Sequence, residues 1–283
     1  MSKILYGRYS GRPKDFLVNR FLRIFPTYWV VLVIGGILIA VNPEEIGTFD
    51  FSIGMPDSYG SWVRNLLIFN LSSAPLIVPQ AWSLAIEMNW YIMLFIGSFL
   101  PQKWLVRFFL ANLILPFIII FVFYGVVYQQ GAGFAFSLGA LAYHSKVRPQ
   151  KSLQILSIIL LILLMFVAPL YFEYSGLNMK TLSANFSLLA SAILLFIALP
   201  WLTEEKAVSK LSSLAGDLSY PLFLIHQYVS WTAFHWFNVP RLGWLTLLVR
   251  TLFSLLVSLL IVRVVEHPVA ILRAKIRTRG APS

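Results

Sequence analysis

Long apolar segments alternate with short polar islands along this sequence, and most of the apolar segments are about as long as a bilayer is thick. A helix needs about 20 apolar residues to cross the hydrocarbon core of a membrane. Strands of a membrane β-barrel would instead alternate in polarity over about ten residues, a pattern not seen in this sequence. The pattern therefore predicts an all-α bundle of about eight transmembrane helices. The expected spans cover residues 25–41, 82–100, 105–124, 131–145, 152–172, 181–201, 218–238 and 243–263.

One further apolar segment, residues 62–78, does not fit a simple span. It is interrupted by Arg64, Asn65, Asn70 and Pro75. Polar and helix-breaking residues at membrane depth are tolerated where the backbone is covered by protein or lies near the interface. We therefore expect an interfacial or re-entrant segment here.

Charge is scarce and unevenly placed along the chain. The 283 residues are 59% hydrophobic and 12% charged, which is too little charge for a soluble domain of this length. The 22 Lys and Arg residues outnumber the 11 Asp and Glu residues. If the N-terminus is cytoplasmic, only Arg64, Lys180 and Arg241 of the loop cations fall on the outer side, as the positive-inside rule requires. Both termini are therefore expected in the cytoplasm.

The same features predict where the protein resides and what it contacts. We expect a multi-pass protein of the cell's inner (plasma) membrane, in contact with the lipid bilayer and its anionic headgroups rather than with nucleic acid. We also expect one membrane domain over residues 1–283, with a cytoplasmic basic tail at 264–283. The absence of cysteine excludes thiol nucleophiles. The four histidines show no metal-ligand spacing, so neither a metal nor a bound cofactor is expected.

Glu87 lies within a predicted span, where a charged side chain costs a few kcal/mol. Ser83, Glu87 and residues 90–91 share one face of a helix. That face would present a hydroxyl, a carboxylate and aromatic rings to the bundle interior, suited to holding a substrate hydroxyl or transferring its proton. Alternatively, a neutral or Arg-paired Glu87 would fix helix packing. Intramembrane carboxylates are more often functional, which favours the first interpretation.

Two other ionisable residues lie within predicted spans. Arg250 pairs with Glu87 in one interpretation, and extends toward the interface in the other. His226, in the middle of span 218–238, is a candidate acid, base or hydrogen-bond donor. A histidine that bonds across helices for structural reasons explains the same position equally well.

Arg20 and Arg23 are spaced i, i+3 and therefore share a helix face at the inner membrane surface. Two guanidinium groups there could bind the phosphates of a cytosolic ligand. Ordinary anchoring by positive charge, with Tyr28 and Trp29 in an aromatic belt, explains them as well. Composition alone favours anchoring.

Four segments read as motifs in a fixed order. Residues 20–29 read RFLRIFPTYW, residues 81–87 read AWSLAIE, residues 218–226 read LSYPLFLIH and residues 265–268 read VEHP. In content, order and spacing they resemble the R-x-x-R-I-x-P-x-Y-W, W-S-L-x-x-E, S-Y-P-x-Y-L-x-H and E-x-P segments of the acyltransferase 3 family of membrane O-acyltransferases. The resemblance extends over essentially the whole chain.

The resemblance implies an enzyme that moves an acetyl or other short acyl group from acyl-CoA to a sugar hydroxyl of a cell-surface polysaccharide or related glycan. Acyl-CoA, typically acetyl-CoA, would be the co-substrate. Arg20 and Arg23 would face the acyl donor, which reverses the interpretation from composition. Glu87 would lie near the acceptor path and His226 would line the cavity. The expected catalytic residues are Glu87 and His226, and the expected substrate-binding residues are Arg20, Arg23, Trp82, Ser83, Tyr91 and Arg250.

The sequence departs from the family at its start. Members typically carry two more spans before the R-x-x-R segment, the first with an Arg and with the His proposed as the catalytic base. Here about 20 residues precede that segment. We expect this hairpin to be missing through a misplaced start or a truncation, and we expect low or no transfer by the 283-residue chain.

Two other classes of function remain open at this stage. A proton-coupled transporter or flippase would use Glu87, His226 and Arg250 as its pathway. A non-catalytic membrane subunit would tolerate the substitutions Glu87→Gln and Arg23→Ala. Neither class accounts for the four motifs as simply as acyl transfer does.

Overall fold

The computed structural model of the protein describes residues 9, 11–49, 52–69, 75–101, 210–237 and 243–278, together with short stretches and single residues between 104 and 197. The chain falls into two compact units, one of residues 1–13 and 92–206 and the other of residues 14–91 and 207–283. Most described residues belong to the second unit. The fold and the site are therefore described within that unit.

The described elements are helical, and the part of the chain described contains no strand, only an isolated bridge between Ile53 and Leu76. The helices are α1 (Pro13–Val41), α2 (Pro43–Phe49), α3 (Tyr59–Leu67), α4 (Ala81–Gly97), α9 (Lys210–Phe237), α10 (Trp244–Ile261), the π-helical turn η2 (Val262–Glu266) and α11 (His267–Thr278). The all-α prediction is confirmed for these residues.

Four of the predicted spans coincide with helices. Spans 25–41, 82–100, 218–238 and 243–263 correspond to α1, α4, α9 and α10. The spans predicted at 105–124, 131–145, 152–172 and 181–201 lie largely or wholly outside the described residues. The total of eight spans and the cytoplasmic termini therefore stay predictions.

Helix α1 begins at Pro13, twelve residues before the predicted span. Its 29 residues extend for roughly 43 Å, which exceeds the ~30 Å hydrocarbon core. The apolar pattern indicated only the part that would lie in lipid, because the first three turns are polar on one face. Arg20 and Arg23 are consequently fixed on the body of a helix rather than in a preceding loop.

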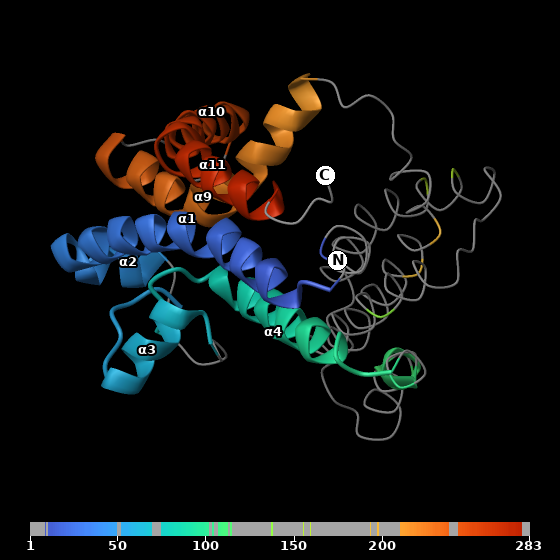
Figure 1. The fold of residues 1–283 in the computed structure, drawn as a ribbon. Helices are drawn as coiled ribbons and strands as arrows, with labels where there is room; N and C mark the ends of the chain where they lie inside the picture. The colour runs from blue at the N-terminus through green and yellow to red at the C-terminus, as the bar shows by residue number, and fades with distance from the viewer. Residues whose placement is uncertain are drawn as a thin grey trace. The chain divides into compact units, whose positions relative to one another are not determined.

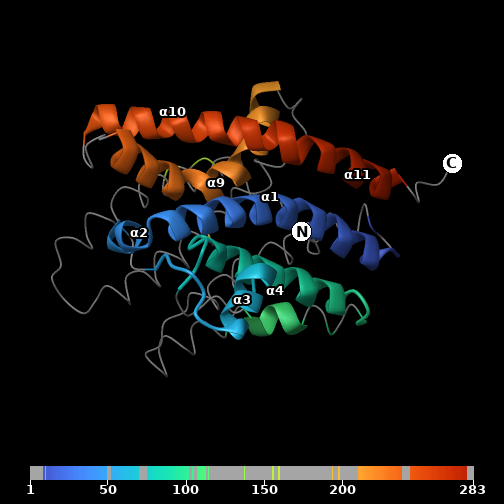
Figure 2. The ribbon, with the colours of Figure 1, turned by 90° about the vertical axis from the view of Figure 1, so that its left-hand side faces the viewer.

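Helix α1 lies in the middle of the second unit. Figures 1 and 2 show α9, α10 and α11 on one side of it and α3 and α4 on the other. The Tyr220 hydroxyl donates to the carbonyl of Ile24 at 2.8 Å, and Tyr228 packs against Gly35. Helix α9 therefore runs in the same direction as α1, which agrees with the alternation of the predicted spans.

The apolar surface of these helices is typical of a protein in lipid. Among the described residues, α1 and the stretch Thr246–Arg277 are long and apolar enough to cross a membrane. Side chains every fourth residue along the second stretch are more than half exposed; these are Leu248, Leu252, Leu256, Leu260 and Val264. A continuous apolar stripe of this kind is unfavourable in water and favourable against acyl chains.

The segment predicted as interfacial or re-entrant contains a short helix and a return of the chain. Ser58 caps α3 by accepting a hydrogen bond from the N–H of Ser61 at 3.2 Å. The helix ends at Ile68, which has a left-handed backbone with a φ of 54°. The chain then returns so that Leu76 pairs with Ile53.

A buried polar network holds this return against the long helices. Asn65 accepts a hydrogen bond from the N–H of Ile77 and donates to Ser61, each at 3.0 Å. Tyr28 of α1 donates to the carbonyl of Asn65 at 2.5 Å, and Tyr228 of α9 donates to the carbonyl of Ile77. We call Tyr28, Asn65, Ile77 and Tyr228 the Asn65 network. Each of these residues is at most 1% exposed.

The rod formed by α10, η2 and α11 contains a wide turn with a clear local cause. Pro268 has no N–H, and its ring would clash with the carbonyl of Val264 in a regular α-helix. The backbone widens just before it, and the N–H of His267 bonds to the carbonyl of Val262, five residues back. The helix then continues to Thr278, within the stretch that the sequence predicted as a basic tail.

Candidate functional site

Arg20 is a buried cation held between two aromatic rings. Its side chain is 5% exposed, and its guanidinium carbon lies 5.3 Å from the ring centroids of both Phe16 and Tyr91. The two rings meet edge to face, 5.9 Å apart. Cation–π contacts of this kind orient a guanidinium group without neutralising its charge.

Two further arginines, Arg23 and Arg273, lie within electrostatic range of this region and also carry a positive charge. Arg273, on α11, is within electrostatic range of Arg20, Arg23 and Glu266. Arg23 is exposed, whereas Arg273 is half-buried. No carboxylate oxygen of a described residue lies within 4.0 Å of the guanidinium nitrogens of these three arginines. We call Arg20, Arg23 and Arg273 the arginine cluster.

The cluster has buried donors that no protein acceptor uses. The Nε atoms of Arg20 and Arg273 are both buried and lack a hydrogen-bond partner. An uncompensated buried guanidinium is unfavourable unless an anion neutralises it and accepts its N–H bonds. The arrangement is therefore suited to a bound anion with several acceptor oxygens, such as a phosphate.

Glu87 lies beside this cluster. Its carboxylate accepts a hydrogen bond from the hydroxyl of Tyr91, one turn later on α4. Tyr91 is 1% exposed and is within electrostatic range of Arg20, Arg23 and Glu87. The predicted face of α4 therefore does bring a carboxylate and an aromatic hydroxyl together, next to the two arginines of α1.

A second carboxylate, Glu266, enters the same region from η2. Thr27 of α1 is 1% exposed and donates to the Glu266 carboxylate at 2.5 Å. Tyr220 of α9 lies within electrostatic range of Glu266, Glu87 and Arg23. Two carboxylates and the two arginines of α1 thus lie within electrostatic range of the buried Tyr91 of α4 or the half-buried Tyr220 of α9.

Trp82, Ser83 and His226 make none of the contacts described above. Trp82 is exposed, and Ser83 is half-buried and donates to the carbonyl of Gln80 at 3.0 Å. His226 is exposed, and its Nδ1 lies 2.9 Å from the carbonyl of Phe223 on its own helix. Six residues separate it from Tyr220, about 240° around the helix, so the two side chains leave different faces. The contacts of the arginine cluster and of Glu87 do not include His226.

Arg250 is half-buried on α10. Its pairing with Glu87 stays a prediction, as do the catalytic roles of Glu87 and His226. His235, at the other end of α9, pairs with Glu45 of α2 at 2.6 Å and stacks on Trp231.

The sequence interpretation did not select Thr27, Tyr220, Glu266 or Arg273 as site residues. Tyr220 and Glu266 stood within motifs, and their positions could have been weighted for that reason. Glu266 and Arg273 are seven residues apart, a spacing that places both on one helix face. The predicted span ended at 263, so this face was interpreted as tail.

Most of the sequence also matches a known family. The family model described as "Acyltransferase domain", that of the acyltransferase 3 family, matches residues 6–263. This chain belongs to the acyltransferase 3 family. No curated protein and no solved structure matches it.

The match confirms the suspected family and includes the first three motifs, whereas the fourth motif, at 265–268, lies just beyond the matched residues. All four motifs supply residues of this region: Arg20, Arg23 and Thr27 from the first, Glu87 from the second, Tyr220 from the third and Glu266 from the last. His226, also in the third motif, makes none of the contacts described above for these residues. Arg273 lies beyond the matched residues.

Proposed function

We propose that this protein transfers an acetyl or other short acyl group from acyl-CoA to a sugar hydroxyl of a cell-surface polysaccharide or related glycan. The observation that carries the proposal concerns Arg20, which is buried and has no ion-pair partner among the described residues. Arg20 lies near Glu87, and the chain belongs to a family of membrane acyltransferases. A CoA thioester carries phosphates that match the arginines.

In this proposal Arg20 and Arg23 bind the phosphates of the donor. Arg20 is held in place by Phe16 and Tyr91, so little side-chain entropy is lost when the anion binds. Arg23, being exposed, supplies a guanidinium group that a cytosolic ligand can reach. Fixed positive charge also steers a polyanionic donor toward the site.

The reaction forms a C–O ester bond and breaks the C–S thioester bond. The sugar hydroxyl attacks the acyl carbonyl, and the hydroxyl proton ends on the sulfur of the departing thiol. Glu87, whose carboxylate is oriented by the Tyr91 hydroxyl, would hold or polarise the acceptor hydroxyl. His226 remains the candidate base from the sequence, and it would act only if the acceptor reaches the exposed face of α9.

The direct test is transfer of labelled acetyl from acetyl-CoA to glycan in membranes that contain the protein. The assay is run on this chain and on one preceded by the two-span segment of another family member. Transfer is expected with acetyl-CoA in at least the second protein, and it should fall at least about 100-fold in Arg23→Ala and Glu87→Gln.

Arg263→Ala is the matched control, because Arg263 is an exposed arginine on η2 and makes none of the contacts described above. Its transfer should equal that of the parent protein. Transfer in neither protein, or equal loss in Arg263→Ala and Arg23→Ala, would contradict the proposal. Ion-gradient-dependent uptake that persists in Arg23→Ala would instead favour a transporter.

A further inference from the structure

Helix α11 reaches the site because of the wide turn that precedes it. A π-type turn inserts one extra residue and rotates everything after it by about 100° relative to a continuous α-helix. If a regular α-helix replaced η2, the side chain of Arg273 would leave the helix in a different direction relative to α10. With η2, Glu266 and Arg273 both lie on the face that meets α1.

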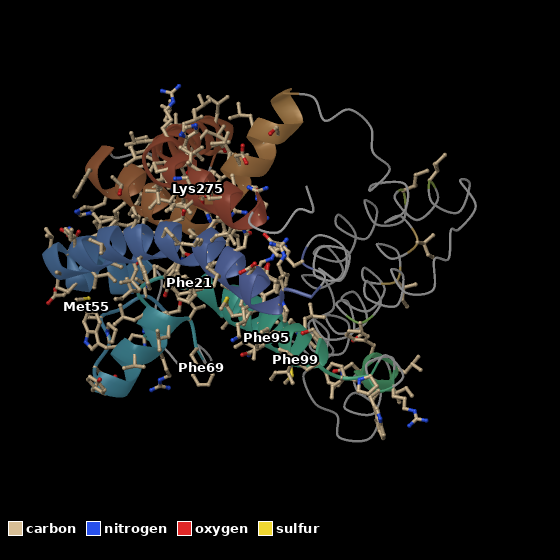
Figure 3. All side chains as sticks on the ribbon, in the orientation of Figure 1. Phe21, Met55, Phe69, Phe95, Phe99 and Lys275 are labelled. Carbon is tan, nitrogen blue, oxygen red and sulfur yellow. The ribbon has the colours of Figure 1, made fainter. Side chains whose placement is uncertain are left out.

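Two contacts fix that face against α1. Thr27 donates to the Glu266 carboxylate at 2.5 Å, and the side-chain amide of Asn19 donates to the backbone carbonyl of Arg273 at 3.4 Å. Asn19 is itself 5% exposed. Figures 1 and 2 show α11 beside the first half of α1, and Figure 3 labels Phe21 and Lys275 on these two helices.

Arg273 therefore has its backbone tied to α1 while its charged group is left without a protein acceptor at Nε. Its guanidinium group stands within electrostatic range of three other arginines, Arg23, Arg277 and Arg20, and of one carboxylate, that of Glu266. The three charges of the arginine cluster repel one another. This repulsion is not expected if α11 serves only for packing. Arg20 is 5% exposed, and its Nε has no hydrogen-bond acceptor either.

We propose that Arg273 is the third guanidinium of a phosphate-binding site formed with Arg20 and Arg23, and that η2 is the device that brings it there. The site extends the proposed donor site beyond the residues that match the family, and as a donor site it rests on the proposed function. Its ligand is a phosphate-bearing molecule, either the CoA donor or an anionic lipid headgroup.

The test measures equilibrium binding of CoA, without turnover, to the full chain in nanodiscs. Parent protein, Arg273→Ala, Arg273→Lys and the control Arg263→Ala are compared in phosphatidylcholine alone and with added phosphatidylglycerol. If CoA is the ligand, Arg273→Ala should weaken binding by about tenfold or more. Arg273→Lys should recover part of that loss as a point charge, and Arg263→Ala should bind as the parent does.

A lipid ligand gives a different result. Arg273→Ala would then leave CoA binding in phosphatidylcholine unchanged but retain less phosphatidylglycerol than Arg263→Ala does, and the phosphate site would stand. Equal CoA binding together with equal lipid retention in Arg273→Ala and the parent overturns the inference, even if Arg23→Ala still loses CoA. A parent protein that binds no CoA at all contradicts the proposed function, whereas the lipid comparison still decides the role of Arg273.

Discussion

The arginine cluster and the Asn65 network lie along the same helices, α1 in particular, but differ in how their polar groups are satisfied. In the Asn65 network the buried amide oxygen, amide nitrogen and two tyrosine hydroxyls all have partners within the protein. In the arginine cluster the buried Nε atoms of Arg20 and Arg273 have none.

This difference separates a structural site from a binding site on physical grounds. A buried polar group with its partners stabilises the fold, because breaking the bond leaves the other member unpaired. A buried charge without partners destabilises the empty protein and becomes favourable only when a ligand supplies the partner. Substitutions at the two sites should therefore change stability in opposite directions.

The sharpest way to break the comparison is Arg20→Met, which keeps the length of the side chain and removes its charge. Loss of the guanidinium should weaken acetyl-CoA binding by about 100-fold, because a desolvated charge-assisted contact is lost. The unfolding midpoint of the ligand-free protein should stay the same or rise, because an uncompensated buried charge is removed. Calorimetry of binding and thermal unfolding in detergent measure the two effects. A fall in the midpoint together with unchanged binding would make Arg20 structural.

At the Asn65 network the expected sign is the opposite. Asn65 is 1% exposed. Asn65→Ala removes the acceptor of the Ile77 N–H and the donor to the Ser61 carbonyl. The free energy of unfolding should fall by about 2 kcal/mol. Asn89→Ala, at an exposed position on α4, should leave it nearly unchanged. Detergent-titrated unfolding compares the two variants, and equal stabilities would remove the network from the account.

The packing beneath the network allows a matched pair of glycine variants. A Cβ atom at Gly35 would lie 2.5 Å from the hydroxyl of Tyr228, whereas one at Gly36 would meet nothing within 4 Å. Gly35→Ala should lower the free energy of unfolding by about 1–3 kcal/mol through overpacking. Gly36→Ala should be neutral, or stabilising by up to about 1 kcal/mol through helix propensity. The same unfolding assay measures both, and a stable Gly35→Ala would contradict the close approach of α9 to α1.

The contact between Thr27 and Glu266 has the smallest expected effect and sharpens the boundary between the two regions. Thr27→Val keeps the side-chain shape and removes the hydroxyl, so the hydrogen bond from α1 to Glu266, directly before α11, is lost. The free energy of unfolding should fall by about 1 kcal/mol. Thr251→Val on exposed α10 is the control, since its hydroxyl bonds only to Leu247 of its own helix. Hydrogen exchange of α11 amides should rise in the first variant and not in the second.

The sequence was sufficient for the all-α fold class and for the positions of four helices, for reasons visible in particular residues. Runs such as 25–41 and 243–263 are apolar on all sides, so length alone identified α1 and α10. The ends were less predictable, because Arg20 and Arg23, two members of the arginine cluster, lie on a part of α1 that the apolar pattern does not include. The predicted last span ended at 263, whereas η2 lets the helix continue past Pro268.

For the site, spacing within one helix was informative and proximity between helices was not. The i, i+4 relation of Glu87 and Tyr91 followed from the sequence, and the structure joins them. The expected convergence of His226 with the arginines could not be tested by spacing, because it depends on the rotation of α9 about its axis. The role of Arg273 was not predictable for a similar reason, since its direction follows from a one-residue insertion in η2, the turn directly before α11.

The central claim is that the arginine cluster lacks protein partners because a phosphate-bearing donor occupies it. An experimental structure of the full chain with CoA in a lipid nanodisc tests this most directly. The account predicts phosphate oxygens within about 3 Å of the guanidinium nitrogens of Arg20 and Arg23, with Glu87 still bonded to Tyr91. CoA bound at another place, with carboxylates of the protein paired to these arginines, would contradict it.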